Sequence, residues 1–411
     1  MSTESITIAR AREIILETAP EPNLSNVVSL DSACGCITAA AVYAANPLPT
    51  YTNSAMDGYA FRYGDLTGTQ RAVLPIVGHS FAGAPCTVTD FAPGSCIEIA
   101  TGAAVPGALD TVIPFEKCET NLKEHSIAFD VCDIKRAANI RYAGEQIQPG
   151  DILIEQGTRL TTRHIALMAA AGVTQISTFS PIRVAVITTG SELVEPGEPL
   201  GSYQTYNSNA IMLKLMLQAV GCQVQTSAAT EDNDQAIAKK ITEALKDNDL
   251  LLLTGGAGNG RFDLSQTQLG SMGLMQPWSI NMRPGRPMRF GQIQGKPVFV
   301  LPGNPVAAFV TCLEFVCPAL HKMQGLSAPF GLPEHPAVLA CDIRKKAGRA
   351  EFMRGRIIGY ENAIPVVEPL SNQGSADLIM LSQADVILCL DHAPDHYSKG
   401  EIVSVQSLHQ I

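Results

Sequence analysis

The sequence predicts a multidomain α/β plus β protein, and three observations lead to this fold class. The first is its length of 411 residues, because a single hydrophobic core rarely grows past about 250 to 300 residues. The second is an alternation of apolar strands and amphipathic helices between residues 182 and 320, which is typical of a doubly wound parallel sheet. The third is a change to short strand-like runs, broken by Gly and Pro, on both sides of this segment, which predicts smaller β domains.

Composition and charge argue against several classes of protein. Hydrophobic residues make up 46% of the chain and charged residues 17%, which is enough apolar surface for packed cores and too much for a disordered chain. The 29 Lys and Arg residues against 39 Asp and Glu residues give a net charge of −10. This is the wrong sign for a protein that holds the phosphate backbone of nucleic acid. We therefore expect no nucleic-acid partner.

No membrane span is expected. The most apolar stretch, residues 297–320, is interrupted by prolines and by Glu314, so it lacks the roughly 20 consecutive apolar residues of a membrane helix. The first 20 residues carry charged side chains throughout and lack the apolar block of a secretory signal. We therefore expect the protein in the cytoplasm.

The first part of the chain is predicted to contain a discontinuous domain with a second domain inserted into it. Residues 1–46 and 142–177 are expected to form one extended segment, with helices at 7–18 and 162–171. The intervening residues 47–141 are predicted to be a β-rich domain, with strand-like runs at 72–77, 95–100 and 111–115.

Residues 178–326 are predicted to form the parallel-sheet domain. In its first helix Ile211, Leu215 and Ala219 recur at i, i+4 spacing and are predicted to face the core. Asn207 and Asp232 stand before two of the helices as predicted N-terminal caps. The expected strands are 183–187, 223–228, 250–254 and 297–301, and the expected helices are 208–220, 235–245 and 305–320.

The last part of the chain, residues 327–411, is predicted to form a small β-barrel, with a β-sandwich as the alternative. Prolines mark the linker that leads into it. The expected strands are 337–342, 351–358, 363–367, 386–390 and 402–405.

Candidate site residues follow the strands of the parallel sheet, where open α/β sheets bind their ligands. Glu192, Asp232 and Asp263 each come shortly after a predicted strand, and a Gly-rich turn at 255–260 precedes Asp263. Backbone N–H groups of such a turn can contact phosphate oxygens, and carboxylates are ligands for Mg²⁺. We therefore expect Mg²⁺ bridging to a phosphate group at this edge, and a tight turn without a ligand is the alternative.

Two further segments carry candidate binding residues. Arg283 and Arg286 are held between prolines and a glycine, which favours binding of an oxyanion, whereas a solvated basic turn is the alternative. In the β-rich domain, residues 53–60 mix polar side chains with glycine and are predicted to be a binding loop rather than a core strand. Thr101, Glu116 and Arg141 stand at turns or strand ends of the same domain, where surface exposure explains them equally well.

Several segments together resemble one known family. They are PTYTNSAMDGYA at 49–60, TGAAVP at 101–106, TGSEL at 189–193, RPGRP at 283–287, LPGNP at 301–305 and FMRGR at 352–356. Their types and their order are similar to those of the MoeA family, the molybdopterin molybdenumtransferases, which include the E domain of gephyrin. The segments span nearly the whole chain and as a set are highly specific.

The resemblance implies a function in molybdenum cofactor biosynthesis. The family inserts molybdate into the dithiolene of adenylylated molybdopterin, with release of AMP, in a Mg²⁺-dependent reaction. It also implies an elongated homodimer that uses the N-terminal extended domain for dimerisation. The active cleft would lie between the Mog-like α/β domain of one subunit and the MDGYA-bearing domain of the other. The implied partners are the upstream molybdopterin adenylyltransferase and downstream molybdoenzymes or their chaperones.

The resemblance also implies roles for individual positions of this chain. Asp57, Glu192, Asp232 and Asp263 match the acidic residues of the family's site, and Asp57, Glu192 and Asp263 are the expected metal contacts. The expected substrate-binding residues are Thr101, Glu116, Arg141, Gly255, Gly256, Gly258, Arg283, Arg286, Pro302, Pro305, Arg354 and Ser375.

Two positions depart from the family pattern. Gly258 stands where the family has a serine in its Gly-rich loop, and Ser279 stands where it has a lysine. A lost hydroxyl donor can cost a charge-assisted hydrogen bond of about 1.5 to 3 kcal/mol. The alternative to an active transferase is therefore a weakened paralogue that carries molybdopterin or acts as a protein scaffold. A third interpretation is adenylyl transfer by the Mog-like domain itself.

Overall fold

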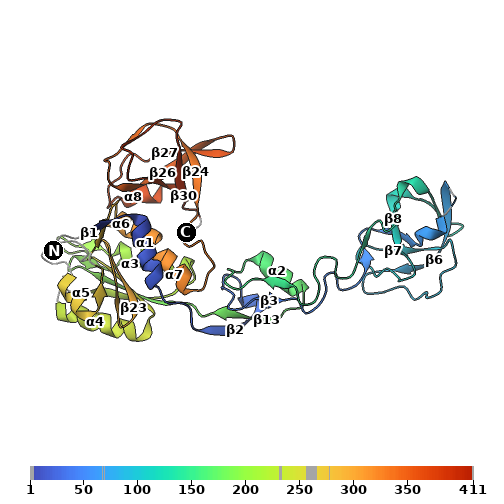
Figure 1. Ribbon diagram of the computed structural model, residues 1–411, viewed down its shortest axis with the longest axis horizontal. Helices are drawn as coiled ribbons and strands as arrows, with labels where there is room; N and C mark the ends of the chain where they lie inside the picture. Colours follow the sequence, from blue (N-terminus) through green and yellow to red (C-terminus); the bar gives the residue numbers. More distant parts are fainter. Residues whose placement is uncertain are drawn as a thin grey trace.

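The computed structural model describes residues 4–66, 68, 70–230, 234–255, 266–276 and 278–409, which form an elongated molecule (Figure 1). An α/β region and a C-terminal barrel pack together at one end, and a β-rich region occupies the other end. A small middle region, built from two segments of the chain, connects them. The chain therefore runs out from the α/β end through the middle region and returns the same way.

The α/β region is built on a six-stranded sheet in the order β17-β14-β18-β23-β22-β19. The first four strands run parallel to one another. β22 pairs antiparallel with both of its neighbours, β23 and β19. Alternate residues of the central strands point to opposite faces, so Leu250 packs towards α1, α3, α6 and α7 whereas Leu251 packs towards α4 and α5. The predicted doubly wound sheet is therefore confirmed. Its strands are β14 Arg183–Thr189, β17 Gln223–Thr230, β18 Leu250–Thr254, β19 Leu274–Met275, β22 Arg289–Ile293 and β23 Lys296–Leu301, and its helices are α3 Ser208–Ala219, α4 Asp234–Asp247, α5 Gln266–Met272, α6 Pro305–Thr311 and α7 Cys317–Met323.

Helix α3 is confirmed, but the prediction of its buried face was wrong. Ile211 is 47% exposed and Leu215 is 58% exposed. The side chains that pack against the sheet are Ala210, Leu213, Met216 and Leu217. Apolar residues surround this helix on several sides, so i, i+4 spacing alone cannot select the face that the sheet covers.

The N-terminal segment is part of the α/β region. Strand β1 (Glu4–Ile6) pairs in parallel with β20 (Trp278–Ile280). Helix α1 (Ile8–Thr18) follows, is capped by the Thr7 hydroxyl, and buries Ala11 and Ile15 in the core shared with α7. Ser279, one of the two positions that depart from the family pattern, is paired with Ser5 in this small sheet.

The middle region and the β-rich region follow each other along the molecule (Figure 1). The middle region consists of β2 Ser25–Ser29 paired with β13 Gln175–Phe179, β3 Val42–Tyr43 paired with β12 Ile152–Ile154, and α2 Thr162–Ala170. The β-rich region has a six-stranded sheet in the order β8-β5-β7-β6-β10-β9 and a short β4-β11 pair. Its strands are β4 Asn53–Ser54, β5 Gly58–Phe61, β6 Arg71–Ser80, β7 Cys96–Ile99, β8 Thr111–Pro114, β9 Glu119–Asn121, β10 Ser126–Asp130 and β11 Ile140–Arg141.

The prediction that residues 53–60 form a loop rather than a core strand was wrong for its second half. Strand β5 begins at Gly58 and is buried between β7 and β8. A Cβ atom on Gly58 would lie 2.0 Å from the carbonyl oxygen of Ile113, so glycine is what allows the two strands to approach. The motif is therefore a loop that turns directly into a buried strand.

The C-terminal region is a closed five-stranded barrel, in which β26, β27, β24, β30 and β28 pair in turn and β28 returns to β26. The barrel, one of the two predicted architectures, is confirmed. Strand β21 (Met282–Arg283) of the α/β region adds to β26 and joins the two units. The remaining elements are β24 Glu334–Leu339, β25 Ile343–Arg344, β26 Ala350–Glu361, β27 Ile364–Pro369, α8 Leu378–Ser382, β28 Val386–Leu390, β29 His396–Tyr397 and β30 Ile402–Ser407.

One described segment, Pro305–Met323, is long and apolar enough to span a membrane by length and composition alone, yet 89% of it is buried inside the protein. It comprises α6, a π-helical turn at Cys312–Val316 and α7. This burial is the property of a core helix.

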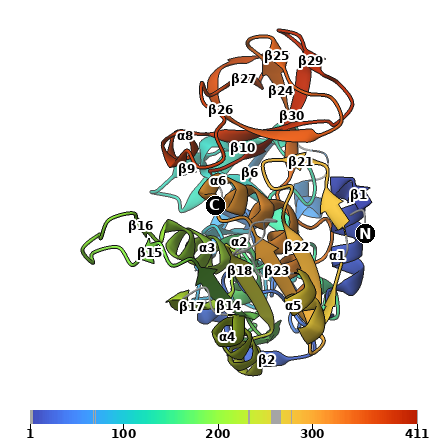
Figure 2. The same ribbon diagram turned by 90° about the vertical axis from the view of Figure 1, so that its left-hand side faces the viewer.

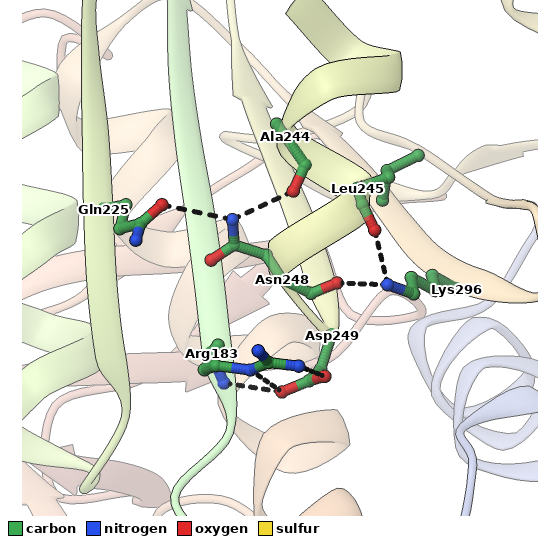
Figure 3. Close-up of polar contacts among 7 residues, drawn as sticks. All are labelled: Arg183, Gln225, Ala244, Leu245, Asn248, Asp249 and Lys296. Carbon is green, nitrogen blue, oxygen red and sulfur yellow. Dashed lines mark hydrogen bonds and ion pairs between the residues drawn. The ribbon is translucent and has the colours of Figure 1, made fainter.

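A polar network closes the amino ends of the strands (Figure 3). Arg183 at the start of β14 donates to both carboxylate oxygens of Asp249, at 3.2 and 2.9 Å. Lys296 at the start of β23 donates to the carbonyl oxygens of Leu245 and Asn248 at the end of α4, the second at 2.7 Å. A cation at a helix C-terminus is favourable because it meets the negative end of the helix dipole.

Candidate functional site

A pocket of about 690 Å³ lies at the carboxyl edge of the α/β sheet. The strands β14 and β18 end in it at Thr188, Thr189 and Thr254. This is the position where open α/β sheets bind ligands. The other lining residues are Gly190, Glu192, Leu193, Thr205, Tyr206, Asn207, Ser208, Asn209, Gly255, Pro287, Pro302, Gly303, Asn304, Pro305, Ala376 and Leu378.

The start of α3 forms one wall of the pocket. The Asn207 side-chain oxygen accepts from the backbone N–H of Ala210 at 3.2 Å, which confirms the predicted cap, and its Nδ2 donates to Thr188 Oγ1 at 2.9 Å. The N–H groups in the first turn of a helix lack intrahelical partners. Since Ser208 and Asn209 of that turn line the pocket, this wall favours an anionic group such as a phosphate.

Asn209 joins the ends of two strands, β18 and β23, beside the pocket. Its Nδ2 donates to Thr254 Oγ1 at 3.1 Å and to the Gly303 carbonyl oxygen at 2.8 Å, and Thr254 Oγ1 donates to the Pro302 carbonyl oxygen at 3.2 Å. These bonds hold the turn after β23 against the end of β18. The floor of the pocket is therefore rigidly built.

Gly255 is required by this close packing. Its φ is +91°, and a Cβ atom there would lie 2.4 Å from the carbonyl oxygen of Thr189. Both the left-handed backbone and the space favour glycine. The predicted binding residues Gly255, Pro302 and Pro305 all line the pocket.

A loop of the barrel closes the pocket on another side. The backbone N–H of Val306 donates to the Ser375 carbonyl oxygen at 3.0 Å, and Asn304 Nδ2 donates to Ser375 Oγ at 2.9 Å. Ala376 and Leu378, which follow, line the pocket. The C-terminal region therefore takes part in this site, as expected for Ser375.

Arg354 supports the loop from within. Its side chain is fully buried, and Nη2 donates to the carbonyl oxygens of Asn372 and Gly374 at 2.9 and 3.1 Å. In the described part of the chain Nε and Nη1 have no hydrogen-bond partner. Burial lowers the pKa of Arg354, and the nearby positive charge of Arg283 lowers it further, whereas Asp377 opposes the shift. Because the side chain is fully buried, Arg354 acts on the pocket through the loop that it holds.

The RPGRP segment runs along the outer side of the pocket. Arg283 is exposed and lies 3.6 Å from the carboxylate of Glu351, Arg286 is exposed, and Pro287 lines the pocket. Both arginines are thus available to solvent, and Arg283 is close enough to Arg354 to lower its pKa.

A second group of predicted residues gathers in the β-rich region. Asp57 Oδ1 accepts from the backbone N–H of Thr101 at 2.7 Å, and this bond, together with the Thr101 hydroxyl, lowers the pKa of Asp57. The carbonyl oxygen of Asp57 accepts from Phe115 N at 3.3 Å, which brings Glu116 close by. Arg141 in β11 is paired with Asn53 in β4 beside them. All four predicted residues of this group are exposed.

The structure thus divides the predicted site into two groups at opposite ends of the molecule (Figure 1). Glu192, Arg283, Arg354 and Ser375 belong to the α/β end. The β-rich end holds Asp57, Thr101, Glu116 and Arg141. Asp232, Asp263, Gly256 and Gly258 lie outside the described residues.

Several residues of the pocket were missed by the sequence reasoning. Asn207 was predicted only as a cap, and Asn209 and Thr254 were not considered, although all three line the pocket. The available signal was the run of polar residues directly after each strand end. Ser279 does not line the pocket.

A metal site is incomplete in the part of the chain that the structure describes. Within it, no group of three or more His, Cys, Asp and Glu side chains is placed to hold a metal ion. Of the two predicted metal contacts that the structure describes, Glu192 lines the pocket and Asp57 lies in the other group.

Family models match three consecutive parts of the chain. A model for the MoeA N-terminal region, domains I and II, matches residues 6–172. One for a probable molybdopterin binding domain matches residues 185–322, and one for the MoeA C-terminal region, domain IV, matches residues 336–408.

Similar proteins agree with these models. The chain is 32% identical over 406 residues to a molybdopterin molybdenumtransferase of Haemophilus influenzae, covering 99% of both chains. It is 31% identical to molybdopterin molybdenumtransferase 2 of Mycobacterium tuberculosis, over 81% of this chain and 85% of that protein. The crystal structure of a molybdopterin biosynthesis MoeA protein from Pyrococcus horikoshii matches with a TM-score of 0.79 at 25% identity, over 98% of this chain and 99% of that one. The chain therefore belongs to the MoeA family of molybdopterin molybdenumtransferases.

Proposed function

We propose that the protein acts in molybdenum cofactor biosynthesis by inserting molybdate into the dithiolene of adenylylated molybdopterin, with hydrolytic release of AMP. The pocket at the carboxyl edge of the sheet carries this proposal. It lies in the part of the chain that matches a probable molybdopterin binding domain. Two named molybdenumtransferases share about a third of their residues with this chain over most of its length.

The pocket walls suit a ligand with phosphate groups. The first turn of α3 offers unpaired N–H groups, and Gly255 leaves room for a close approach to the backbone. The volume of about 690 Å³ falls within the range of small-molecule sites. We assign the α3 wall to the phosphates of the substrate.

The donor set is compatible with Mg²⁺ on those phosphates. Mg²⁺ is commonly held by one or two carboxylates together with substrate phosphates and water. Glu192 supplies one carboxylate at the pocket, and Asp263 and Asp57 remain the other predicted metal contacts. If bound there, Mg²⁺ would supply positive charge that stabilises the departing AMP. Glu192 would hold the ion at the pocket.

Molybdate, the second substrate, is assigned to the exposed Arg283 and Arg286. Their planar guanidinium groups can each offer two parallel donors to an oxyanion. Arg354, which is fully buried, would act by holding the loop that carries Ser375. The oxyanion would thus bind beside the pocket, where the α/β region meets the barrel.

A homodimer would bring the two groups of site residues together. Asp57 and its neighbours cannot reach the pocket of their own chain, because the two groups lie at opposite ends of the molecule (Figure 1). Tyr43 and Ile152, which are cross-strand partners in the middle region, are 57% and 48% exposed. Such exposed apolar pairs favour contact with a second copy through the same surface.

The remaining expectations are part of the same proposal. The chain divides into domains at 1–46 with 142–177, 47–141, 178–326 and 327–411, except that residues 4–18 pack in the α/β region. It acts in the cytoplasm, receives its substrate from the molybdopterin adenylyltransferase and delivers cofactor to molybdoenzymes or their chaperones.

The first experiment follows AMP release and cofactor formation together. Purified protein is mixed with adenylylated molybdopterin, Mg²⁺ and a low concentration of molybdate, and an apo-molybdoenzyme reports the product. AMP release with active enzyme is the expected result. Tight pterin binding without AMP release would instead establish the weakened carrier.

The assignment of molybdate has its own test. Arg286→Gln removes one guanidinium from the proposed oxyanion site, so the molybdate concentration for half-maximal rate should rise at least tenfold. Arg356→Gln is the control, because Arg356 is also exposed but pairs with Glu368. Equal effects of both changes would rule the assignment out.

A further inference from the structure

A separate cavity of about 260 Å³, which we call the joint cavity, lies where the middle region meets the α/β region. In the α/β region, α3 and α6 lie side by side on one face of the sheet, and α4 covers the other face (Figure 2). The end of α3 and the helical segment that continues α6 supply the walls of the joint cavity, and Arg159 of the middle region closes it. None of these lining residues belongs to the pocket at the carboxyl edge of the sheet.

The walls of the joint cavity are largely apolar. Met216 and Leu313 are buried, and Leu332 is half-buried beside them. The volume lies just below the range of about 300 to 1,000 Å³ that is typical of small-molecule sites. The space therefore suits a small apolar group, such as a single ring or a short branched chain.

Arg159 gives the joint cavity a positive charge. Among the described residues that line it, Arg159 is the only one with a charged side chain at neutral pH, because burial and the charge of Arg159 lower the pKa of His321 to about 4. Burial lowers the pKa of Arg159 as well, and the groups that oppose this shift are the thiols of Cys222 and Cys36, not a carboxylate. A partly buried guanidinium without a carboxylate partner favours an anion.

The hydrogen bonds of Arg159 hold its side chain in place and leave donors free. Nη1 donates to the Gly35 carbonyl oxygen at 3.2 Å, and Nη2 donates to the Val220 carbonyl oxygen at 3.4 Å and to Gln324 Oε1 at 3.2 Å. All three acceptors are neutral. A guanidinium has five N–H donors, so two of them form no hydrogen bond in the described part of the chain. The cation is thus fixed in position with donors to spare.

We propose that the joint cavity binds a small monocarboxylate with an apolar body, with the carboxylate on Arg159 and the body against Met216, Leu313 and Leu332. One negative charge matches the one cation and its two spare donors. A phosphate dianion fits less well, because its second charge would lose water without meeting another cation. The proposal stands apart from the proposed reaction, since the joint cavity and the pocket share no residue.

The test titrates the full chain with para-fluorobenzoate and follows binding by fluorine NMR. Saturable binding to one site is expected. The matched probe is para-fluorobenzamide, which has nearly the same shape without the charge and should bind at least tenfold more weakly. Equal binding of the two probes, or no saturation at millimolar concentrations, would overturn the proposal.

Two variants locate the bound probe. Arg159→Gln removes the cation, and Ala219→Phe fills the joint cavity from its exposed rim and leaves the cation in place. Each should weaken the binding of para-fluorobenzoate at least tenfold. The controls are Arg163→Gln on α2 and Leu215→Phe, one turn earlier on α3, because both residues are exposed and neither lines the joint cavity. Unchanged binding in Arg159→Gln or in Ala219→Phe would place the probe elsewhere and overturn the proposal.

Discussion

The two ends of the α/β sheet carry the same kinds of residue and use them differently. At the amino end the carboxylate of Asp249 is paired with Arg183, and Lys296 donates hydrogen bonds to the carbonyl oxygens at the end of α4 (Figure 3). At the carboxyl end the carboxylate of Glu192 faces a pocket of about 690 Å³ with no ion pair in the described part of the chain.

Asn248 at the amino end and Asn209 at the carboxyl end form the same number of hydrogen bonds. Asn248 Nδ2 donates to the Ala244 carbonyl oxygen and to Gln225 Oε1, and Asn209 Nδ2 likewise donates twice. Both leave their Oδ1 without a partner. Hydrogen-bond counts therefore do not separate the two ends. The two ends differ in the unpaired charge and the open space of the carboxyl end, and these support the proposed site there.

Removing the unpaired charge should have the largest effect. Glu192→Gln is expected to lower cofactor formation about 100-fold, because it removes a charge that acts on the reacting phosphates. The thermal midpoint should not change, since the carboxylate is exposed and forms no ion pair. AMP release and unfolding are measured on the same samples. Near-normal AMP release would remove Glu192 from the mechanism.

Adding a Cβ atom should cost more stability at Gly255, at the carboxyl end of the sheet, than at Gly295, at its amino end. Gly255→Ala at the carboxyl end should destabilise the protein by about 2 kcal/mol or more, since the new Cβ meets the Thr189 carbonyl oxygen. Gly295→Ala at the amino end also has a positive φ, but its Cβ would meet nothing within 4 Å. It should cost about 1 kcal/mol. Urea unfolding of both variants measures the difference, and equal losses would contradict the argument.

The matched asparagines should separate stability from binding. Asn209→Ala and Asn248→Ala are each expected to lower the unfolding free energy by about 1 kcal/mol, because each removes two hydrogen bonds. Only Asn209→Ala should weaken molybdopterin binding, by roughly tenfold, because it releases the floor of the pocket. Binding and unfolding titrations of both variants decide this. A binding loss in Asn248→Ala would show that the two ends are coupled.

The smallest expected effect is the pH dependence of the amino end. Burial alone would raise the pKa of Asp249, but the hydrogen bonds and the charge of Arg183 outweigh burial and the pKa is lowered from 3.8. A lowered carboxylate pKa adds stability above the unfolded value, and this stability is lost as the pH falls through the folded value. Asp249→Asn should therefore be less stable by up to about 1 kcal/mol at pH 7, and the difference should shrink as the pH falls below 3.8. A difference that persists in acid would contradict the pairing.

The sequence predicted secondary structure correctly where the local pattern of apolar residues favours one type of element. The strand at Leu250–Thr254 was predicted with its observed bounds, because four consecutive leucines between polar residues are typical of a buried strand. Helix α3 had two apolar faces, and only contact with the sheet decided that Ile211 and Leu215 stay outside. Gly58 was assigned to a loop, since no local pattern reveals that β8 passes 2.0 Å from its missing Cβ.

The sequence by itself determined the family, the alternation of the α/β region and the residue types of the site, because these depend on local order and motif spacing. Only the tertiary structure decided which of those residues meet. Glu192, Gly255 and Pro302 come from three strand ends that parallel pairing places at one edge. Asp57 lies at the far end of the molecule, because the middle region holds the β-rich region away from the pocket (Figure 1). Distances across a fold depend on packing, and packing involves residues far apart in the chain.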